Sequence, residues 1–449
     1  MVIARITKAG DDRMNSLLGM ARSSAWNRRS TLVWVVVSLA LATALLWTLE
    51  RLRSDIRSSF SQSVSGVDLI VGARSSSVQL MLFSVFHIGN QPQTLSMDSV
   101  RAVAQHRSVA WVVPLSLGDS HRGFPVLGTT TAYFQHFAYG DKQALVLQQG
   151  SSFAGTLDGL FETVIGSEVA RKLGYGIGQS ITLAHGMHDH DHDHDHSGEL
   201  SEAQDEHSDK PFKVVGILAP TGTPVDRTVH VSLQALEALH LDWTGGTPLP
   251  GGQIPADQAR KFNLEPDEVT AALVGLKSRA AVFNVQRFVN LYEAEALMGV
   301  LPGVALGELW SVLGIGESAL LAVSALVALV SVVSLMAVVL AGLNERRREL
   351  AVLRAVGAAP RHVLTLLTLE GLWVTTAGIG LGVVLAQAGM WLATPWLQSA
   401  LGIRLQLEMP LPTQWALLVA VWLAGLLASL GPAWRAYRLS LADGLSPRL

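Results

Sequence analysis

The chain has 449 residues, of which 49% are hydrophobic and only 15% are charged, and its formal net charge is −3. This composition and the positive mean hydropathy exclude an ordinary soluble protein and predict a membrane protein. The absence of cysteine excludes disulfide bonds and thiolate metal sites, and we expect no nucleic-acid partner.

The N-terminal 30 residues place Leu17, Leu18 and Met20 among basic and small residues, which predicts an amphipathic cytoplasmic segment on the inner membrane surface. An apolar run at residues 31–49 follows. Small residues at 40–44 also fit the cleavage site of a signal peptide. A retained anchor is favoured, because the apolar stretch continues past that point and is too long for a signal core.

Four apolar runs are long enough to cross about 30 Å of hydrocarbon. The predicted spans are residues 31–49, 317–343, 362–393 and 413–432. Arginines before the first span, between the second and third, and after the fourth predict that segments 1–30, 344–361 and 433–449 are cytoplasmic. Residues 50–316 and the short loop 394–412 then lie outside. Arg51, Arg53 and Arg57 oppose this rule, which long translocated domains obey poorly.

The outer segment, residues 50–316, alternates strand-like and helix-like pieces. We expect strands at 67–71, 109–117, 163–166, 181–184, 212–218 and 271–276, and helices at 97–106, 167–173, 232–240 and 282–297. The predicted fold class is therefore α+β: four transmembrane helices with a large mixed α/β extracytoplasmic domain inserted between the first and second.

A histidine-rich loop at residues 185–210 interrupts this domain. Its candidate metal ligands are His185, His188, His190, His192, His194, His196 and His207, interleaved with carboxylates. Imidazole and carboxylate donors at this density can surround Zn²⁺ without a preformed cage, and would also bind nickel or copper. The alternative is a disordered, solvated insertion, and both interpretations can hold. We expect no permanently bound cofactor, but Zn²⁺ or another divalent transition metal at this loop.

The basic stretch at residues 344–361 separates the second and third spans. Asn344 can cap a helix that Gly357 and Pro360 end, with Leu350 and Leu353 on one face and arginines over the rest. This pattern predicts a surface helix that offers its charged side to a protein. The alternative is a positive loop that only sets topology.

Within the apolar cores of the four spans, residues 31–49, 319–343, 363–393 and 413–430, Glu370 is the only side chain ionised at pH 7, which argues against a metal channel. The carboxylate of Glu370 could pack between helices, or simply reach the inner interface or a nearby arginine. Gly378 and Gly382 form a small-xxx-small pair that allows another helix to approach closely. No phosphate-binding loop or common hydrolase motif is present, so the chain is predicted to be non-catalytic.

The order of residues 345–357, followed by Leu369-Glu370-Gly371, resembles the C-terminal permease region of the MacB/FtsX-like family, also called type VII ABC transporters. The ending at 431–438 with 442–445 looks like the same family's closing motif, and residues 164–218 are similar to its outer core domain. The resemblance implies a homodimer that recruits a cytoplasmic ABC ATPase dimer through the helix between spans two and three, so that ATP acts only through the partner.

The resemblance also implies residue roles. The ATPase-coupling residues would be Glu345, Arg346, Arg347, Arg348, Glu349, Leu350, Leu353, Arg354 and Gly357, and Glu370 matches a family glutamate that couples within the membrane. ATP-driven closure would tilt the spans and do mechanical work outside. Relatives expel macrolides and peptides, extract lipoproteins or control cell-wall hydrolases. The histidine loop and additional arginines depart from these relatives, so the substrate does not transfer.

These observations predict a permease subunit in the bacterial inner membrane that is linked to zinc or other metal homeostasis. Its expected partners are the ATPase dimer, a second copy of this chain, the lipid bilayer, and a periplasmic adaptor or metal-binding protein. Two alternatives stay open: a metal-responsive membrane receptor or scaffold without an ATPase, and, within the family, a lipoprotein-releasing or small-molecule or peptide efflux permease.

Overall fold

The computed structural model describes residues 29–63, 65–89, 93–185, 209–244, 247–248, 254–345, 359–401 and 412–438. The chain divides into two compact units. A helical unit comprises Met1–Asp55, Gly314–Trp396 and Leu405–Leu449, and an α/β unit comprises Ile56–Leu313 and Leu397–Arg404.

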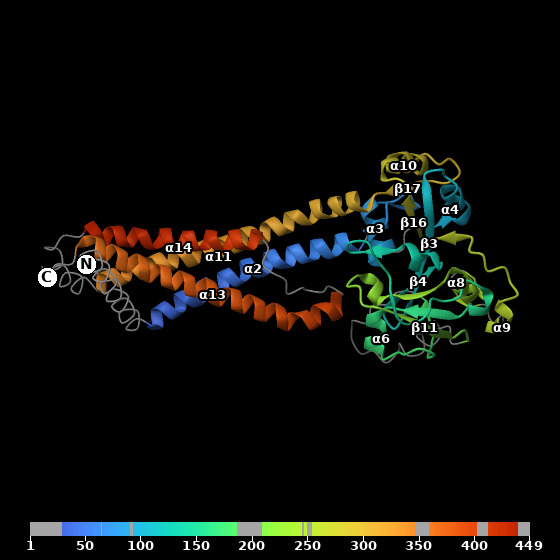
Figure 1. The fold of residues 1–449 in the computed structure, drawn as a ribbon, viewed down its shortest axis with the longest axis horizontal. Helices are drawn as coiled ribbons and strands as arrows, with labels where there is room; N and C mark the ends of the chain where they lie inside the picture. Colours follow the sequence, from blue (N-terminus) through green and yellow to red (C-terminus); the bar gives the residue numbers. More distant parts are fainter. Residues whose placement is uncertain are drawn as a thin grey trace, which may run out of the picture. The chain divides into compact units, whose positions relative to one another are not determined.

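Four long helices carry the apolar runs: α2 (Arg29–Gln62), α11 (Pro302–Glu345), α13 (Pro360–Leu401) and α14 (Pro412–Arg438) (Figure 1). Each contains a stretch long and apolar enough to cross a membrane. With 34 and 44 residues, α2 and α11 measure about 51 and 66 Å at ~1.5 Å per residue, well beyond the ~30 Å of hydrocarbon. Both helices therefore continue past the bilayer core.

Small residues set the packing of the membrane helices. A Cβ atom added to Gly382 of α13 would lie 2.6 Å from the carbonyl oxygen of Ala40 in α2, and one on Gly378 would lie 2.8 Å from Leu39. The predicted close approach at this glycine pair is thus confirmed, with α2 as the partner helix. Gly425 of α14 faces Thr375 of α13 in the same way, at 2.5 Å. Without such glycines the backbones could not come so near.

The α/β unit is built on one mixed sheet, which has 11 strands within the described residues and the main order β17-β1-β16-β3-β4-β12-β8-β11-β7. Its strands are β1 (Leu69–Ala73), β3 (Val109–His121), β4 (Phe124–Thr129), β7 (Leu147–Gly150), β8 (Glu162–Ile165), β9 (Ser180–Ile181), β10 (Ala184–His185), β11 (Phe212–Leu218), β12 (Val229–Ser232), β16 (Ala271–Leu276) and β17 (Leu297–Val300). The pairs β4–β12 and β8–β11 are parallel, while the other pairs are antiparallel.

Shorter elements complete the unit. Two-stranded ladders join β2 (Leu95–Ser96) to β15 (Glu268–Val269), β5 (Ala138–Tyr139) to β6 (Gln143–Ala144), and β13 (Trp243–Thr244) to β14 (Thr247–Pro248). The helices are α3 (Ser77–Phe86), α4 (Met97–Ala104), α5 (Ala132–His136), α6 (Ser167–Leu173), α8 (Leu233–His240), α9 (Ala256–Ala259) and α10 (Val282–Asn290). The expected fold class is confirmed: four apolar helices, with a mixed α/β domain between the first and second.

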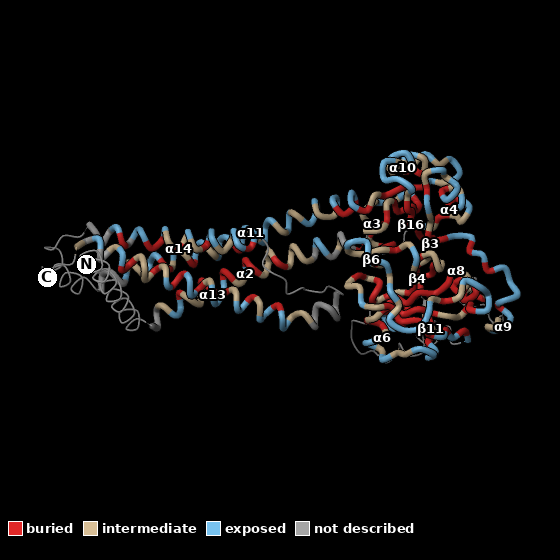
Figure 2. The backbone as a smooth tube through the Cα atoms, in the orientation of Figure 1, coloured by how far each residue is buried: buried red, intermediate tan, exposed pale blue. Residues whose placement is uncertain are grey.

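Local chemistry explains where two of these helices begin. The hydroxyl of Ser96 accepts a hydrogen bond from the backbone N–H of Ser99 at the start of α4, and that of Ser232 accepts one from Ala235 at the start of α8. Such N-caps satisfy amide groups that have no partner within the helix. The central strands are buried (Figure 2), so α8 and its neighbours pack on an apolar face of the sheet.

The expected helix at 282–297 is wrong in its second half. The helix α10 ends at Asn290, and the strand β17 begins at Leu297. The Asn290 side chain accepts a hydrogen bond from the backbone N–H of Gly299, 2.8 Å away, which holds the returning strand against the end of the helix. The apolar residues after 290 therefore belong to the sheet rather than to a longer amphipathic helix.

Replacing Gly382 by alanine tests the α2–α13 packing. The added Cβ meets the Ala40 carbonyl, so the helices must move apart, and we expect a loss of roughly 1–3 kcal/mol in stability. Thermal unfolding of the purified full chain in detergent measures it. Gly380→Ala is the matched control, because a Cβ there has no neighbour within 4 Å. Equal stability of the two variants would contradict this packing.

Candidate functional site

The predicted coupling segment lies between two described helices. α11 ends at Glu345 and α13 begins at Pro360. Most of the predicted coupling residues, namely Arg346, Arg347, Arg348, Glu349, Leu350, Leu353, Arg354 and Gly357, lie outside the described residues. Their helix and its role stay predictions. The structure places Glu345 at the last residue of α11, so the segment follows a membrane-spanning helix directly in the sequence.

Glu370 lies in the cytoplasmic part of α13, where it is half-buried. The next residue, Gly371, faces α14 so closely that an added Cβ would lie 2.4 Å from the Cβ of Ser429. One turn further on, the Thr375 hydroxyl donates to the Gly371 carbonyl over 2.8 Å. Glu370 therefore lies beside the tight contact of α13 with α14, a position from which a displaced α13 would act on its neighbour.

The histidine-rich insertion leaves the sheet at β10. Ala184 and His185 pair with Ser120 and Asp119 of β3 in antiparallel register. Residues 186–208 lie outside the described residues, so the candidate ligands His188, His190, His192, His194, His196 and His207 are not placed. The backbone of His185 is placed at the edge of the domain, and the described chain resumes at Asp209.

The returning end of the insertion is held by a buried ion pair. Lys210 is fully buried, and its Nζ donates to both carboxylate oxygens of Asp242, over 2.8 and 2.9 Å. Asp242 also accepts a hydrogen bond from the backbone N–H of Ile254. Desolvation alone would raise the pKa of Asp242, but the hydrogen bonds from Lys210 and Ile254 and the Lys210 charge hold this pKa below its usual value.

An acidic cleft of about 250 Å³ lies beside the strand pair from which the insertion leaves. Its polar lining comes from Ser116, Asp119, Glu237, His240 and Glu268, and the His240 Nε2 lies 3.5 Å from the Asp119 Oδ1. Partial burial raises the pKa of the Glu237 carboxyl, and Asp267 raises it further, while His240 opposes the shift. The sequence analysis did not identify this cleft, because β3 and α8 bring together residues far apart in the chain.

The cleft does not by itself form a metal centre. Its side chains are of the types that bind divalent metals, but no three histidine, aspartate or glutamate side chains among the described residues lie close enough together to hold an ion. Another histidine, His230, is buried on Tyr133, and its Nδ1 donates to the carbonyl oxygen of Val164, 3.2 Å away. Burial lowers the pKa of His230 to about 3, so this ring stays neutral within the core.

Lys210→Met tests the anchor of the insertion. The variant leaves the carboxylate of Asp242 nearly buried without its cation, and we expect roughly 3–5 kcal/mol of destabilisation by chemical denaturation of the full chain. The double variant Lys210→Met with Asp242→Leu removes both charges and should recover most of that loss. If the single variant is as stable as the wild type, the ion pair does not hold the domain edge.

Two family models of known proteins match parts of this chain. Residues 31–287 match the family model described as "MacB-like periplasmic core domain", and residues 321–441 match "FtsX-like permease C-terminal". The first match alone covers more than half of the 449 residues. No curated protein gives a significant match.

Two solved structures are each similar to about half of the chain. The periplasmic region of MacB from Actinobacillus actinomycetemcomitans is 11% identical with a TM-score of 0.31, covering 56% of this chain and 97% of that one. The extracellular domain of the noncanonic ABC-type transporter YknZ from Gram-positive bacteria is 13% identical with a TM-score of 0.28, covering 52% and 98%. On the two family matches and the four membrane-spanning helices, the chain belongs to the MacB/FtsX-like permeases: it is a multi-pass, non-catalytic transmembrane subunit of an ABC transporter, with its α/β domain in the periplasm.

Proposed function

We propose that this permease acts by mechanotransmission: ATP hydrolysis in a cytoplasmic partner moves the membrane helices, and the helices do work on the periplasmic domain. The observation that carries this proposal is the chemistry of the apolar runs 31–49, 319–343, 363–393 and 413–430, where Glu370 is the only side chain ionised at pH 7. A path for an ion or polar solute through hydrocarbon needs polar or ionisable partners along its whole length. A displacement of the helices needs no such polar partners within the hydrocarbon.

The dimensions of the helices support the same proposal. α2 and α11 flank the α/β unit in sequence, and each is much longer than the hydrocarbon core is thick. A displacement of either helix at the cytoplasmic face is therefore carried by continuous helix to the periplasmic side. The proposed motor is an ABC ATPase dimer that docks on residues 345–357 of two copies of this permease.

Within that segment, we assign the contact to the charged face of the predicted helix. Glu345, Arg346, Arg347, Arg348, Glu349 and Arg354 would meet the ATPase, Leu350 and Leu353 would face the membrane, and Gly357 would end the helix. Glu370 would pass the displacement on, since it lies beside the close contact of α13 with α14.

ATPase activity in the purified permease–ATPase complex tests this assignment. We expect Arg347→Glu with Glu349→Arg, and Gly357→Leu, to lower co-purification of the ATPase and the stimulated activity at least tenfold, because the docking face loses its charge pattern or its end. Arg122→Ala, an exposed turn residue of the periplasmic unit, is the control. A permease that co-purifies with no ATPase would instead be a membrane receptor or scaffold.

We further propose that the histidine-rich insertion gathers Zn²⁺ or another divalent transition metal in the periplasm and links the permease to metal homeostasis. Seven histidines between 185 and 207 supply the donors. The two anchors, β10 on β3 and Lys210 on Asp242, support a loop whose ends are fixed on the periplasmic domain while its donors stay accessible. Because metal must displace protons from imidazole, affinity should weaken below a pH of about 6.5.

Growth under zinc limitation tests the metal proposal. Deleting residues 188–196 removes five histidines, and we expect slower growth when zinc is chelated and normal growth when zinc is restored. The control deletes residues 198–206, which shortens the insertion by the same length without removing a histidine. Equilibrium dialysis of the purified protein should show the matching loss of bound zinc. Unchanged growth and zinc binding after the first deletion would exclude the metal role.

A further inference from the structure

Two polar contacts join α2 and α11 within the helical unit. The hydroxyl oxygens of Ser38 and Ser331 lie 3.1 Å apart, and the Ser331 hydroxyl also lies 3.4 Å from the Ser38 carbonyl oxygen. Near the outer ends of the apolar runs, the Arg53 Nε lies 2.8 Å from the Glu317 Oε2. Each contact connects residues more than 250 positions apart in the chain.

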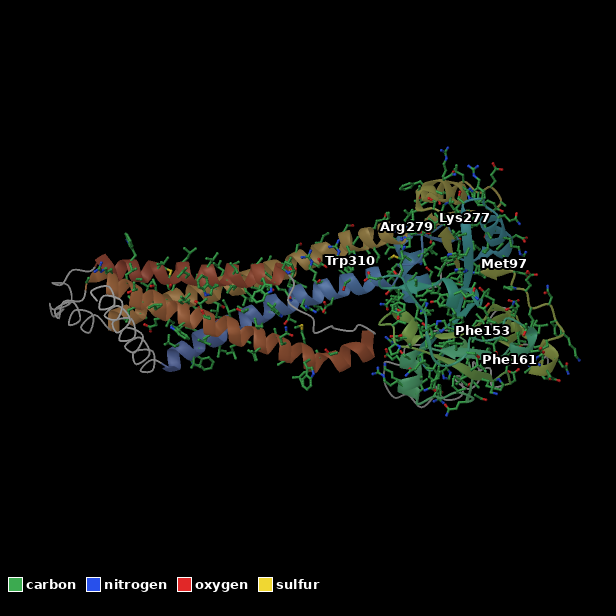
Figure 3. The ribbon with its side chains drawn as sticks, viewed as in Figure 1. Met97, Phe153, Phe161, Lys277, Arg279 and Trp310 are labelled. Carbon is green, nitrogen blue, oxygen red and sulfur yellow. The ribbon has the colours of Figure 1, made fainter. Side chains whose placement is uncertain are left out.

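The two contacts share one antiparallel register. Ser38 and Arg53 are 15 residues apart in α2, and Glu317 and Ser331 are 14 residues apart in α11, which correspond to about 22 and 21 Å. Seven residues further along α2 is Phe60, and seven before Glu317 is Trp310. Within the α/β unit these two rings pack edge to face with centroids 5.8 Å apart; Figure 3 labels Trp310 on α11. The two contacts of the helical unit therefore agree on one register without a slip, and the Phe60–Trp310 pair joins the same two helices within the α/β unit.

The chemistry of these contacts favours a role in fixing the helix register over a role in raising the free energy of unfolding. Ser331 is 2% exposed, and its hydroxyl donates to the Val327 carbonyl of its own helix over 2.9 Å, so its oxygen can accept the hydrogen bond of the Ser38 hydroxyl without competition from water. The side chains of Arg53 and Glu317 are 37% and 25% exposed, so their ion pair adds little stability on its own. However, sliding one helix past the other by a single turn of about 5.4 Å would break both contacts together.

We infer that α2 and α11 move as one rigid unit, and that two contacts between them, Ser38–Ser331 (the inner contact) and Arg53–Glu317 (the outer contact), fix their register. This inference rests on the proposed function, because it states how the proposed displacement is carried. A push at Glu345 displaces α2 together with α11, so both tethers of the periplasmic domain move in the same direction. Arg53 and Glu317 are thus positioning residues that act through the helices that carry them.

A disulfide at the inner contact, between positions 38 and 331, tests whether α2 and α11 slide past one another. The natural chain has no cysteine, so Ser38→Cys with Ser331→Cys introduces the only two thiols. We expect mild oxidation to form the disulfide readily in the full-length permease, and the ATPase rate of the oxidised complex to stay within about twofold of the same sample after reduction. A tenfold or greater loss on oxidation that reductant reverses would show that the two helices must slide or separate, and would overturn the inference.

The outer contact, Arg53–Glu317, is tested by its effect on the rate at which that disulfide forms. In the double-cysteine background, Arg53→Glu should slow disulfide formation several-fold, because it repels Glu317 and Glu50, which lies 3.7 Å from Arg53. Adding Glu317→Arg should restore the rate, while Arg57→Glu, an exposed position of α2, should leave it unchanged. An Arg53→Glu variant that cross-links at the original rate would overturn the inference. Since cross-linking needs no ATPase, this result is independent of whether the proposed function holds.

Discussion

The absence of water from the hydrocarbon core is the constraint on which this protein depends. Backbone groups there must pair within helices, and side chains must be nearly free of charge. The four helices meet both demands, and they associate through close contacts rather than through buried ions. Gly378 and Gly382 allow α13 to approach α2 closely, and Gly425 allows α14 to approach Thr375. The hydroxyls of Ser331 and Thr375 donate hydrogen bonds to backbone carbonyls of the preceding turn. Such a bundle supports our proposal that movement, rather than a polar solute, crosses the membrane.

Charges gather where each helix leaves the hydrocarbon. Arg53 and Glu317 pair at the outer end, and the arginines of the segment after Glu345 lie at the inner end. The periplasmic domain is stabilised differently from the membrane helices, because its mixed sheet has an apolar core of its own on which α8 packs. A long insertion between β10 and β11 is tolerated since its ends are fixed by a strand pair and by the buried Lys210–Asp242 pair. A long hydrophilic sequence can therefore be added there without disturbing the core.

Much of the fold could be predicted from the sequence because its signals are local. Runs of about 20 apolar residues predict the spans, a serine before an apolar pattern predicts the start of α8, and β-branched runs predict strands such as β11. The error after Asn290 arose where a tertiary contact overrides helix periodicity, since the hydrogen bond from Gly299 to Asn290 brings a strand back. The strands β4 and β12 were not predicted, because β4 contains Pro125 and Gly128, which favour turns, and β12 has only four residues.

The candidate site shows the same division. Histidine density is a property of composition and can be read directly, whereas the cleft of Asp119, Glu237 and His240 exists only because β3 and α8 meet in space. The Arg53–Glu317 pair is likewise invisible in one dimension: in the sequence, Arg53 counts only as an arginine on the unexpected side of the membrane. Long-range pairing of this kind requires the antiparallel register of two helices that are separated by the whole periplasmic domain.

The central claim is that movement crosses the membrane and reaches the periplasmic domain. The most direct measurement is the distance between spin labels on the two copies of a Lys142→Cys permease, an exposed periplasmic turn position in a chain without other cysteines, with the partner ATPase bound. The account predicts that the distance distribution shifts between the nucleotide-free state and the state trapped during ATP hydrolysis. An unchanged distribution in a complex that hydrolyses ATP at its full rate would contradict it.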